Sequence, residues 1–261
     1  MCVTVAQRSG RLQRHRHQTG GEKHQSYSYG PNAGGCVHYG EIVAARNGLM
    51  ARGPWAPERV QTSWRADPFQ PTDDVTAAAD DALAALRRRG SPSHDGLAAR
   101  LSGFQAGPDR LALELEPVRW SVRLVAENAA QSLSALTVVR AADGRWLAGR
   151  RAAWLASWAG RWALGAGGAV EVDENPAETL TRELEEEWSV APESLTVEAL
   201  VRLPSELVLL IGLAWLPVGA PEVTPDPEHD AYAWWPADVQ AWPPEADPPL
   251  RQLAGMLAGA R

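Results

Sequence analysis

Two stretches of the chain repeat apolar residues every three or four positions, which is the spacing of an amphipathic helix. The first begins at Thr72 or Asp73 and stops at Gly90, a residue that commonly ends helices. The second begins after Asp247, where two prolines suit the first helical turn. Each helix can bury one face against a core. The two faces consist of Val75, Ala79, Leu83 and Leu86, and of Leu250, Leu253, Met256 and Leu257.

Other apolar runs alternate along the chain or are rich in β-branched residues, as strands are. The turn Ala142-Asp143-Gly144 joins two of these runs into a hairpin. Before the apolar run at residues 111–116, the helical spacing of Leu97, Leu101 and Phe104 predicts a further amphipathic helix. The predicted strands cover residues 111–116, 133–139, 145–151, 161–170, 195–201 and 206–215.

One further helix combines an apolar stripe with a dense acidic face. Asn175 is a good N-cap, Pro176 suits the first helical position, and Glu178 completes the spacing of a capping box. The helix can dock on a core through the stripe. That stripe is formed by Ala177, Leu180, Leu184 and Trp188.

The acidic face of this helix brings three carboxylates together. Glu183, Glu186 and Glu187 are spaced i, i+3 and i+4, so they project from one side. Like charges at this spacing destabilise a helix by roughly a few tenths of a kcal/mol per pair. A hard divalent cation with oxygen ligands would offset the repulsion. Glycines within residues 165–168, just upstream, predict a tight loop whose backbone carbonyls can approach a ligand.

From Gly168 to Val190 the chain resembles the signature of the Nudix hydrolases, G-x5-E-x7-R-E-U-x-E-E-x-G-U, in which U is a bulky aliphatic residue. The one departure is Ser189, which stands where the family has a glycine after the helix. We expect this serine to reduce stability by at most about 1 kcal/mol and to leave the metal ligands untouched. The matching residues are Gly168, Glu174, Arg182, Glu183, Leu184, Glu186, Glu187 and Val190.

The resemblance implies a metal site on this helix. It predicts that Glu183, Glu186 and Glu187 bind Mg²⁺ or Mn²⁺ together with the backbone carbonyl of Gly167. Such an ion neutralises the charge of a diphosphate and lowers the pKa of a bound water for attack on phosphorus.

The resemblance also implies supporting and catalytic residues around that site. Arg182 would orient Glu183, while Glu174 and Gly168 would support the metal shell from the loop. In many relatives a carboxylate from a later loop acts as a further ligand or as the general base. The trio Glu228-His229-Asp230 is its expected source, and we favour Glu228 over Asp230. An ordinary polar turn after two prolines explains the same trio.

Substrate-binding residues carry a weaker signal. Arg150, Arg151 and Arg161 precede the signature and could clamp a diphosphate, although they are equally consistent with surface arginines on strands. Several tryptophans could stack on a base, although aromatic residues more often belong to the core. These tryptophans are Trp154, Trp158, Trp162, Trp234 and Trp235.

Composition narrows the class of protein. The chain has 261 residues, of which 45% are hydrophobic and 12 are tryptophan, so it can bury a sizeable core. No apolar run approaches the ~20 residues of a membrane span, and no secretory signal is visible. A net charge of −7 argues against a nucleic-acid-coating surface. The only two cysteines are Cys2 and Cys36, which fits a reducing cytoplasm.

Three regions are expected along the chain. Residues 1–49 contain six basic and two acidic residues and no sustained hydrophobic period, so we expect a disordered leader, with Met50 as the native start. Residues 50–117 form an accessory region, either a cap on the catalytic domain or a segment that selects substrate or dimerises the protein. Residues 118–261 form the catalytic domain, for which the resemblance implies the Nudix α/β/α sandwich with a mixed sheet.

The leading functional hypothesis is a cytoplasmic, metal-dependent pyrophosphohydrolase that cleaves a nucleoside diphosphate linked to another moiety. An isomerase of the isopentenyl-diphosphate type is an alternative, but it would need a cysteine near the site, and the chain has none after Cys36. A ligand-binding regulator with a degenerate Nudix fold is another, but its signature should have lost carboxylates, and this one keeps them all.

Overall fold

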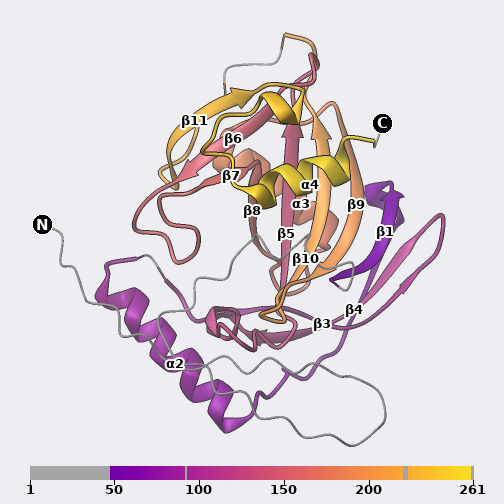
Figure 1. Cartoon of the computed structure of the whole chain (residues 1–261). Helices are drawn as coiled ribbons and strands as arrows, with labels where there is room; N and C mark the ends of the chain where they lie inside the picture. The colour runs from indigo at the N-terminus through magenta and orange to yellow at the C-terminus, as the bar shows by residue number, and fades with distance from the viewer. Residues whose placement is uncertain (1–47, 92, 220–222, 260–261) are drawn as a thin grey trace, which may run out of the picture. The chain divides into compact units, whose positions relative to one another are not determined.

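The computed structural model describes residues 48–91, 93–219 and 223–259. The predicted leader, including Cys2 and Cys36, therefore lies outside the described residues except for its last two positions. Within the described residues there are two β-sheets and three α-helices (Figure 1). No helix among the described residues has the length and apolar character needed to cross a membrane.

The larger sheet has eight strands and is mixed. Its main path runs β1-β9-β10-β5-β6-β11, with β8 paired to β5 and β7 paired to β6. Only β10 and β5 run parallel among these pairs; the others are antiparallel. The strands are β1 (Leu49–Trp55), β5 (Leu133–Arg140), β6 (Trp146–Arg151), β7 (Trp162–Leu164), β8 (Ala166–Ala169), β9 (Ser194–Arg202), β10 (Val208–Trp215) and β11 (His229–Trp235).

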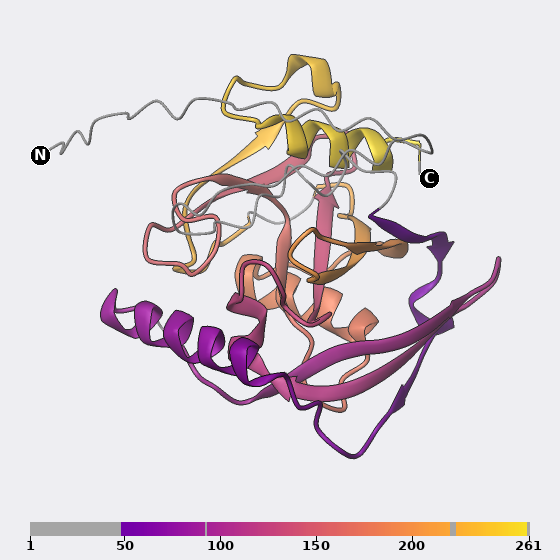
Figure 2. The same cartoon turned by 60° about the horizontal axis from the view of Figure 1, so that its bottom comes forward.

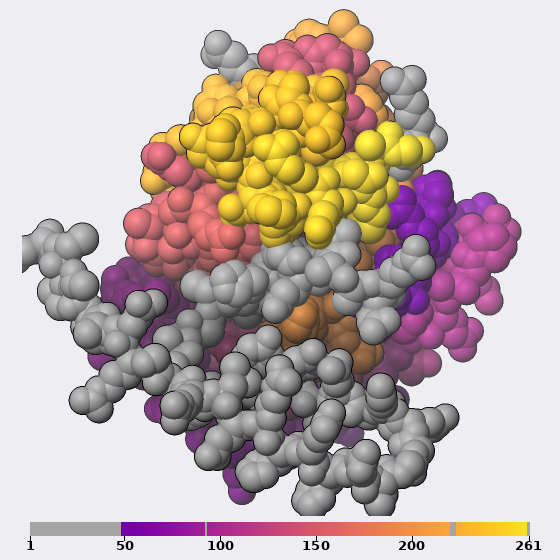
Figure 3. All heavy atoms as spheres, in the orientation of Figure 1, coloured from indigo at the N-terminus to yellow at the C-terminus, as the bar shows by residue number. Residues whose placement is uncertain are grey.

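Helices α3 (Pro176–Trp188) and α4 (Pro248–Leu257) cover opposite faces of this sheet. The alternation of the central strands explains this arrangement. On β10, Leu209, Ile211 and Leu213 pack with α4, whereas Leu210 and Ala214 pack on the side of α3. In Figure 1 α4 lies across strands of the larger sheet, and in Figure 3, drawn in the same orientation, the yellow C-terminal part of the chain forms the surface there. The expected α/β/α sandwich with a mixed sheet is therefore confirmed.

The hairpin predicted around Ala142–Gly144 is confirmed, but its strands separate quickly. β5 and β6 pair only at Arg140 and Trp146. Farther along, β8 pairs with β5 and β7 pairs with β6. This separation lets the segment that leads into the signature enter the sheet between them.

A second sheet of three strands precedes the domain, in the order β2-β4-β3. Its strands are β2 (Val60–Trp64), β3 (Leu97–Ala106) and β4 (Leu111–Arg119), and α2 (Asp73–Arg88) lies between β2 and β3 in the sequence. Helix α2 confirms the prediction, since Val75, Ala79, Leu83 and Leu86 are its buried residues. The first strand of the accessory region, β1, pairs with β9 and so belongs to the larger sheet.

The helix predicted from Leu97, Leu101 and Phe104 is wrong, because this segment is strand β3. The spacing of three between Leu101 and Phe104 comes from a β-bulge. Leu101 pairs with Leu115 and Phe104 pairs with Leu113, with a register shift between them. Because the partners on β4 are two residues apart, Leu101 and Phe104 share one face despite their odd spacing.

The small sheet packs against the side of the domain that carries α3 (Figure 2). Leu101, Leu113 and Leu115 share a core cluster with Val170 and Leu180. Two isolated bridges, from Ala98 to Glu171 and from Arg100 to Ser132, extend the contact. The accessory segment thus lies directly beside the signature helix. After β4 the chain forms a short 3₁₀ helix, η2 (Trp120–Leu124), which lies beyond the expected boundary at residue 117. The accessory segment therefore comprises residues 50–124.

Candidate active site

Helix α3 is fixed at its start and along its apolar side. The Asn175 side chain accepts a hydrogen bond from the Ala177 backbone N–H at 3.0 Å, and Glu178 accepts one from the Asn175 N–H at 3.4 Å. This is the predicted capping box. Leu184 and Trp188 are fully buried, and Trp188 Nε1 donates to the Gly165 carbonyl at 3.1 Å. The remaining face of the helix carries the glutamates.

Arg182 ties three of the acidic residues together. Its guanidinium donates to both carboxylate oxygens of Glu174, at 2.8 and 3.1 Å, a bidentate contact. One further nitrogen, Nη1, donates to Glu183 at 2.8 Å and to Glu186 at 3.0 Å. Burial acts to raise the pKa of Glu174, but hydrogen bonds, first from Arg182 and then from the Glu171 N–H, outweigh it and lower that pKa. Glu174 is thus held as an anion that positions Arg182.

Glu187 is the buried member of the acidic cluster, with 4% of its surface exposed. Its Oε1 accepts a hydrogen bond from the Gly167 N–H at 2.9 Å, and its Oε2 is buried with no hydrogen-bond partner among the described residues. Burial raises the pKa of Glu187 well above its ordinary value of 4.5, against the Gly167 hydrogen bond and the charge of Arg151. Burial likewise raises the pKa of Glu183. Both carboxylates therefore lack sufficient compensation for their charge.

The donor set fits a hard divalent cation. Among the described residues, no three acidic, histidine or cysteine side chains are arranged to hold a metal ion as they stand. Instead, Arg182 donates hydrogen bonds to Glu183 and Glu186, and these bonds account for the orientation of the two carboxylates. The unpartnered Oε2 of Glu187 and the carboxylates beside it are the oxygen donors that Mg²⁺ and Mn²⁺ prefer. We conclude that these residues suit such an ion.

Gly168 is required by the close approach of the helix. A Cβ at this position would lie 2.1 Å from Glu183 Oε1, so any side chain would displace that carboxylate. A Cβ at Gly167 would lie 2.7 Å from the Ala135 carbonyl oxygen of the neighbouring strand. The tight loop predicted from these glycines is wrong at Gly167 and Gly168, because both lie in strand β8. They are needed there because the neighbouring strand and the Glu183 carboxylate approach them closely.

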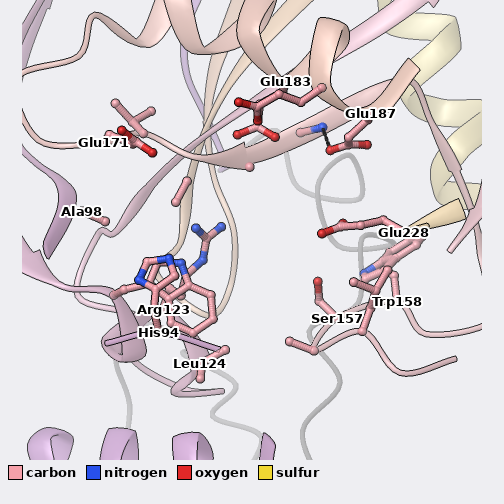
Figure 4. Close-up of a pocket in the computed structure, with 18 of the residues that line it drawn as sticks. His94, Ala98, Arg123, Leu124, Ser157, Trp158, Glu171, Glu183, Glu187 and Glu228 are labelled. Carbon is pink, nitrogen blue, oxygen red and sulfur yellow. Dashed lines mark hydrogen bonds between the residues drawn. The ribbon is translucent and has the colours of Figure 1, made fainter. Parts of the chain in front are cut away.

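The carboxylates of Glu183, Glu186 and Glu187 line a cavity of about 990 Å³, part of which is shown in Figure 4. The signature supplies one wall, and the loop before β11 supplies another with Asp226 and Glu228. The segment between β6 and β7 contributes Trp154, Leu155 and Trp158. The cavity is large enough for a drug-sized or nucleotide-sized ligand.

The trio Glu228-His229-Asp230, at the start of β11, separates in space. Glu228 lines the cavity and accepts a hydrogen bond from Arg151 Nη2 at 3.3 Å. Asp230 instead pairs with Arg150 at 2.6 Å, and both side chains are about half exposed, outside the residues that line the cavity. His229 is buried, and its ring lies 4.4 Å from that of Trp188. The structure thus brings Glu228 to the signature helix and leaves Asp230 at the edge of the sheet.

The three candidate substrate-binding arginines also separate. Arg151 lines the cavity, Arg150 is held by Asp230, and Arg161 Nε donates to Asp247 at 3.1 Å near the start of α4. Of the five tryptophans considered for stacking, Trp154 and Trp158 line the cavity. Trp162 packs against Trp235, with ring centroids 5.6 Å apart.

Sequence reasoning missed several residues that line this cavity, among them His94, Trp120, Arg123 and Asp226. Asp226 had a local signal, because it stands two residues before Glu228 in an acidic turn. The other three had none, because they come from the accessory segment and belong to no recognisable motif.

A family model described as "NUDIX domain" matches residues 131–254, a range that contains the whole signature. Residues 131–254 are a domain of the Nudix hydrolase family. The matched range lies within the expected catalytic domain. Among curated proteins, none matches this chain.

Several solved structures resemble this Nudix domain. A MutT protein from Methanosarcina mazei Go1 is 27% identical, covering 40% of this chain and 75% of that chain, with a TM-score of 0.33. An Ap4A hydrolase from C. elegans is 19% identical, covering 49% of this chain and 98% of that chain, with a TM-score of 0.34. A bifunctional NMN adenylyltransferase/ADP ribose pyrophosphatase from Francisella tularensis, complexed with AMP and a Mn ion, is 17% identical. That match covers 48% of this chain and 40% of that chain, with a TM-score of 0.36.

Proposed function

We propose that this protein is a Mg²⁺- or Mn²⁺-dependent pyrophosphohydrolase that cleaves the diphosphate of a nucleoside diphosphate linked to another moiety. One observation carries the proposal. Glu187 is a buried residue in the lining of a large cavity, and one of its carboxylate oxygens is unpartnered among the described residues. It belongs to a complete set of signature carboxylates. A buried, uncompensated carboxylate is costly unless a cation binds it.

The residues that would hold the ion are Glu183, Glu186, Glu187 and the Gly167 carbonyl. A bound divalent ion would neutralise diphosphate charge and supply an activated water. Arg182 acts as a positioning residue, because it contacts the carboxylates of Glu174 and Glu183 and not the cavity's opposite wall. Gly168 serves by leaving room for the Glu183 carboxylate.

Glu228 is our candidate for the general base. Its carboxylate lines the cavity, and its side chain is about one-third exposed there, so it can accept a proton from a water that attacks phosphorus. Arg151 donates to Glu228 from the cavity wall and is the candidate, among the three predicted arginines, for contact with a phosphate oxygen. Arg150 and Arg161 are engaged elsewhere and are not part of the proposal.

A substrate panel tests the proposal. The purified protein is incubated with dinucleoside polyphosphates, nucleotide sugars, ADP-ribose and nucleoside triphosphates, each with Mg²⁺ or Mn²⁺, in ¹⁸O-labelled water. Mass spectrometry of the products should show one ¹⁸O atom on a phosphate of one product, which identifies both the cleaved bond and the attacked phosphorus. Cleavage that persists after chelation of the metal, or a panel with no cleavage under either metal, would overturn the proposal.

A further inference from the structure

The accessory segment forms a second wall of the cavity, outside the Nudix domain. His94 and Arg123 lie on this wall, facing the side that carries the signature glutamates (Figure 4). Trp120 also lines the cavity. A hydrogen bond fixes the wall in place, since Ser91 Oγ donates to the Trp154 carbonyl at 2.6 Å. The segment after α2 is thereby tied to the loop between β6 and β7. The cavity is closed on this side by residues that no Nudix signature specifies.

Arg123 is the one arginine that the accessory segment contributes to the cavity lining among the described residues. It lies on η2 and points toward Glu183 (Figure 4). Its Nη2 donates to Ser134 Oγ, and it makes no ion pair with any described residue. A guanidinium has five N–H donors, so most of those on Arg123 remain available to a ligand.

Arg123 remains a cation at neutral pH despite its surroundings. Burial lowers its pKa to about 10, an effect that the charge of Glu183 opposes and that of Arg151 reinforces. Arg182, not Arg123, makes the direct contact with Glu183. The Arg123 guanidinium therefore remains available to bind an anionic ligand.

The positions of these charges match the charges of a diphosphate. An ion bound at the glutamates would neutralise the phosphate next to it, and the other phosphate would need a cation farther across the cavity. Arg123, on the wall that faces the glutamates, provides such a cation (Figure 4). Arginine suits this task because its planar fork can donate two parallel hydrogen bonds to phosphate oxygens.

An aromatic surface adjoins Arg123. The Arg123 guanidinium carbon lies 5.8 Å from the Trp120 ring centroid, and the ring centroids of Trp120 and His94 are 5.3 Å apart with planes inclined by 38°. A planar base attached to the second phosphate would reach this pair. Bases stack on aromatic side chains irrespective of their identity, because each has a π-face.

We propose that Arg123 binds the substrate phosphate farther from the metal site and that Trp120, with His94, packs against the attached base. The accessory segment thus supplies part of the substrate site and favours nucleoside diphosphate derivatives. This inference rests on the proposed function, but it concerns ligand binding and can be tested without turnover.

The test measures binding of two probes to the Mn²⁺-loaded full chain by calorimetry: inorganic pyrophosphate, and adenosine 5′-(α,β-methylene)diphosphate, which cannot be hydrolysed at its methylene bridge. Arg123→Met should weaken both probes by about 10- to 100-fold, the value of a charge-assisted contact. Trp120→Leu should weaken the nucleotide by about tenfold and leave pyrophosphate unchanged. Arg65→Met is the matched control, because Arg65 is exposed in the same segment and pairs with Glu114.

Mn²⁺ affinity without probe, measured by electron paramagnetic resonance, should be the same in all variants. If Arg123→Met does not fold, Arg123→Lys keeps the charge without the fork and should weaken pyrophosphate by roughly three- to tenfold. Three results would each overturn the inference: wild-type affinity for both probes in whichever Arg123 variant is used, equal effects of Trp120→Leu on the two probes, or no probe binding by the wild type. Probe binding that depends on Arg123 while no panel substrate is cleaved would instead reject the proposed function alone.

Discussion

In the core of the protein, His229 Nε2 lies 3.7 Å from Glu187 Oε2, and neither atom has a hydrogen-bond partner among the described residues. On its other side, His229 Nδ1 lies 3.3 Å from Asp226 Oδ1. Burial, with the charge of Arg151, lowers the pKa of His229 to about 4, so the ring is neutral at pH 7. A neutral ring has one N–H to share between two carboxylates. That N–H can engage Asp226 or Glu187 but not both, and the ring lies directly beside the Glu187 carboxylate.

Replacing this ring with one that has no nitrogen isolates its polar contribution. We expect His229→Phe to keep the packing on Trp188 and to weaken Mn²⁺ binding by about tenfold, as loss of a residue behind a metal ligand typically does. Electron paramagnetic resonance of free Mn²⁺ would measure the affinity, and the melting temperature would show that the fold is retained. An unchanged affinity in a folded variant would mean that the ring only fills space.

Glu187→Gln should abolish turnover and, without metal, stabilise the protein. Because the pKa of Glu187 is raised in the folded state, the folded protein retains a proton that the unfolded chain releases above pH 4.5. The free energy of unfolding of the wild type should therefore fall as pH rises above 4.5. The variant lacks this loss and should be more stable at pH 8 by on the order of 1–3 kcal/mol.

Urea unfolding in EDTA at pH 4 and pH 8 measures this effect, and the difference between variant and wild type should appear mainly at pH 8. Added Mg²⁺ should stabilise the wild type and leave the variant nearly unchanged. Glu185→Gln, an exposed residue of the same helix, is the matched control and should alter neither stability nor turnover. Full turnover in Glu187→Gln would refute the metal role.

The general base can be assigned by comparing two neighbouring carboxylates. Glu228 lines the cavity, whereas Asp230 pairs with Arg150 outside it. We expect Glu228→Gln to lower kcat about 100-fold, the usual contribution of general-base catalysis, and Asp230→Asn to change it less than about twofold. Steady-state kinetics on the best panel substrate measures both. Equal losses in the two variants would remove Glu228 from this role.

Local sequence patterns predicted most of the signature helix and the cluster of carboxylates on it. The cap at Asn175, the apolar stripe and the i, i+3, i+4 carboxylates involve residues within one or two turns, so spacing alone determines them. The strand period also separates Arg150 from Arg151, because neighbouring strand residues point to opposite faces. Only the second of these arginines lines the cavity.

Non-local contacts account for what the sequence did not reveal. β3 has a helical spacing only because a bulge shifts Leu101 and Phe104 against Leu115 and Leu113, and no local signal announces that pairing. Arg123 and Trp120 reach the cavity because the small sheet packs beside α3. Their role depends on contacts between segments far apart in the chain, which periodicity does not report.

Ser189, the one departure from the signature, gives a prediction about stability alone. Its backbone is left-handed, with φ 55° and ψ 38°, and its N–H closes the helix by donating to the Glu185 carbonyl at 2.9 Å. Glycine adopts this conformation without the steric penalty of a Cβ. Because the Ser189 side chain is exposed, Ser189→Gly should stabilise the protein by up to about 1 kcal/mol and raise the melting temperature by roughly 2–4 °C.

Ser189→Ala separates the backbone effect from loss of the hydroxyl, since alanine keeps the Cβ and should give no increase in melting temperature. Differential scanning calorimetry measures the three melting temperatures, and that of Ser189→Gly should be higher than those of the wild type and of Ser189→Ala. Among the described residues no hydrogen bond joins the Ser189 side chain to a carboxylate of α3, so kcat should be the same in all three. A glycine variant that melts no higher than the alanine variant would show that the left-handed position carries no strain.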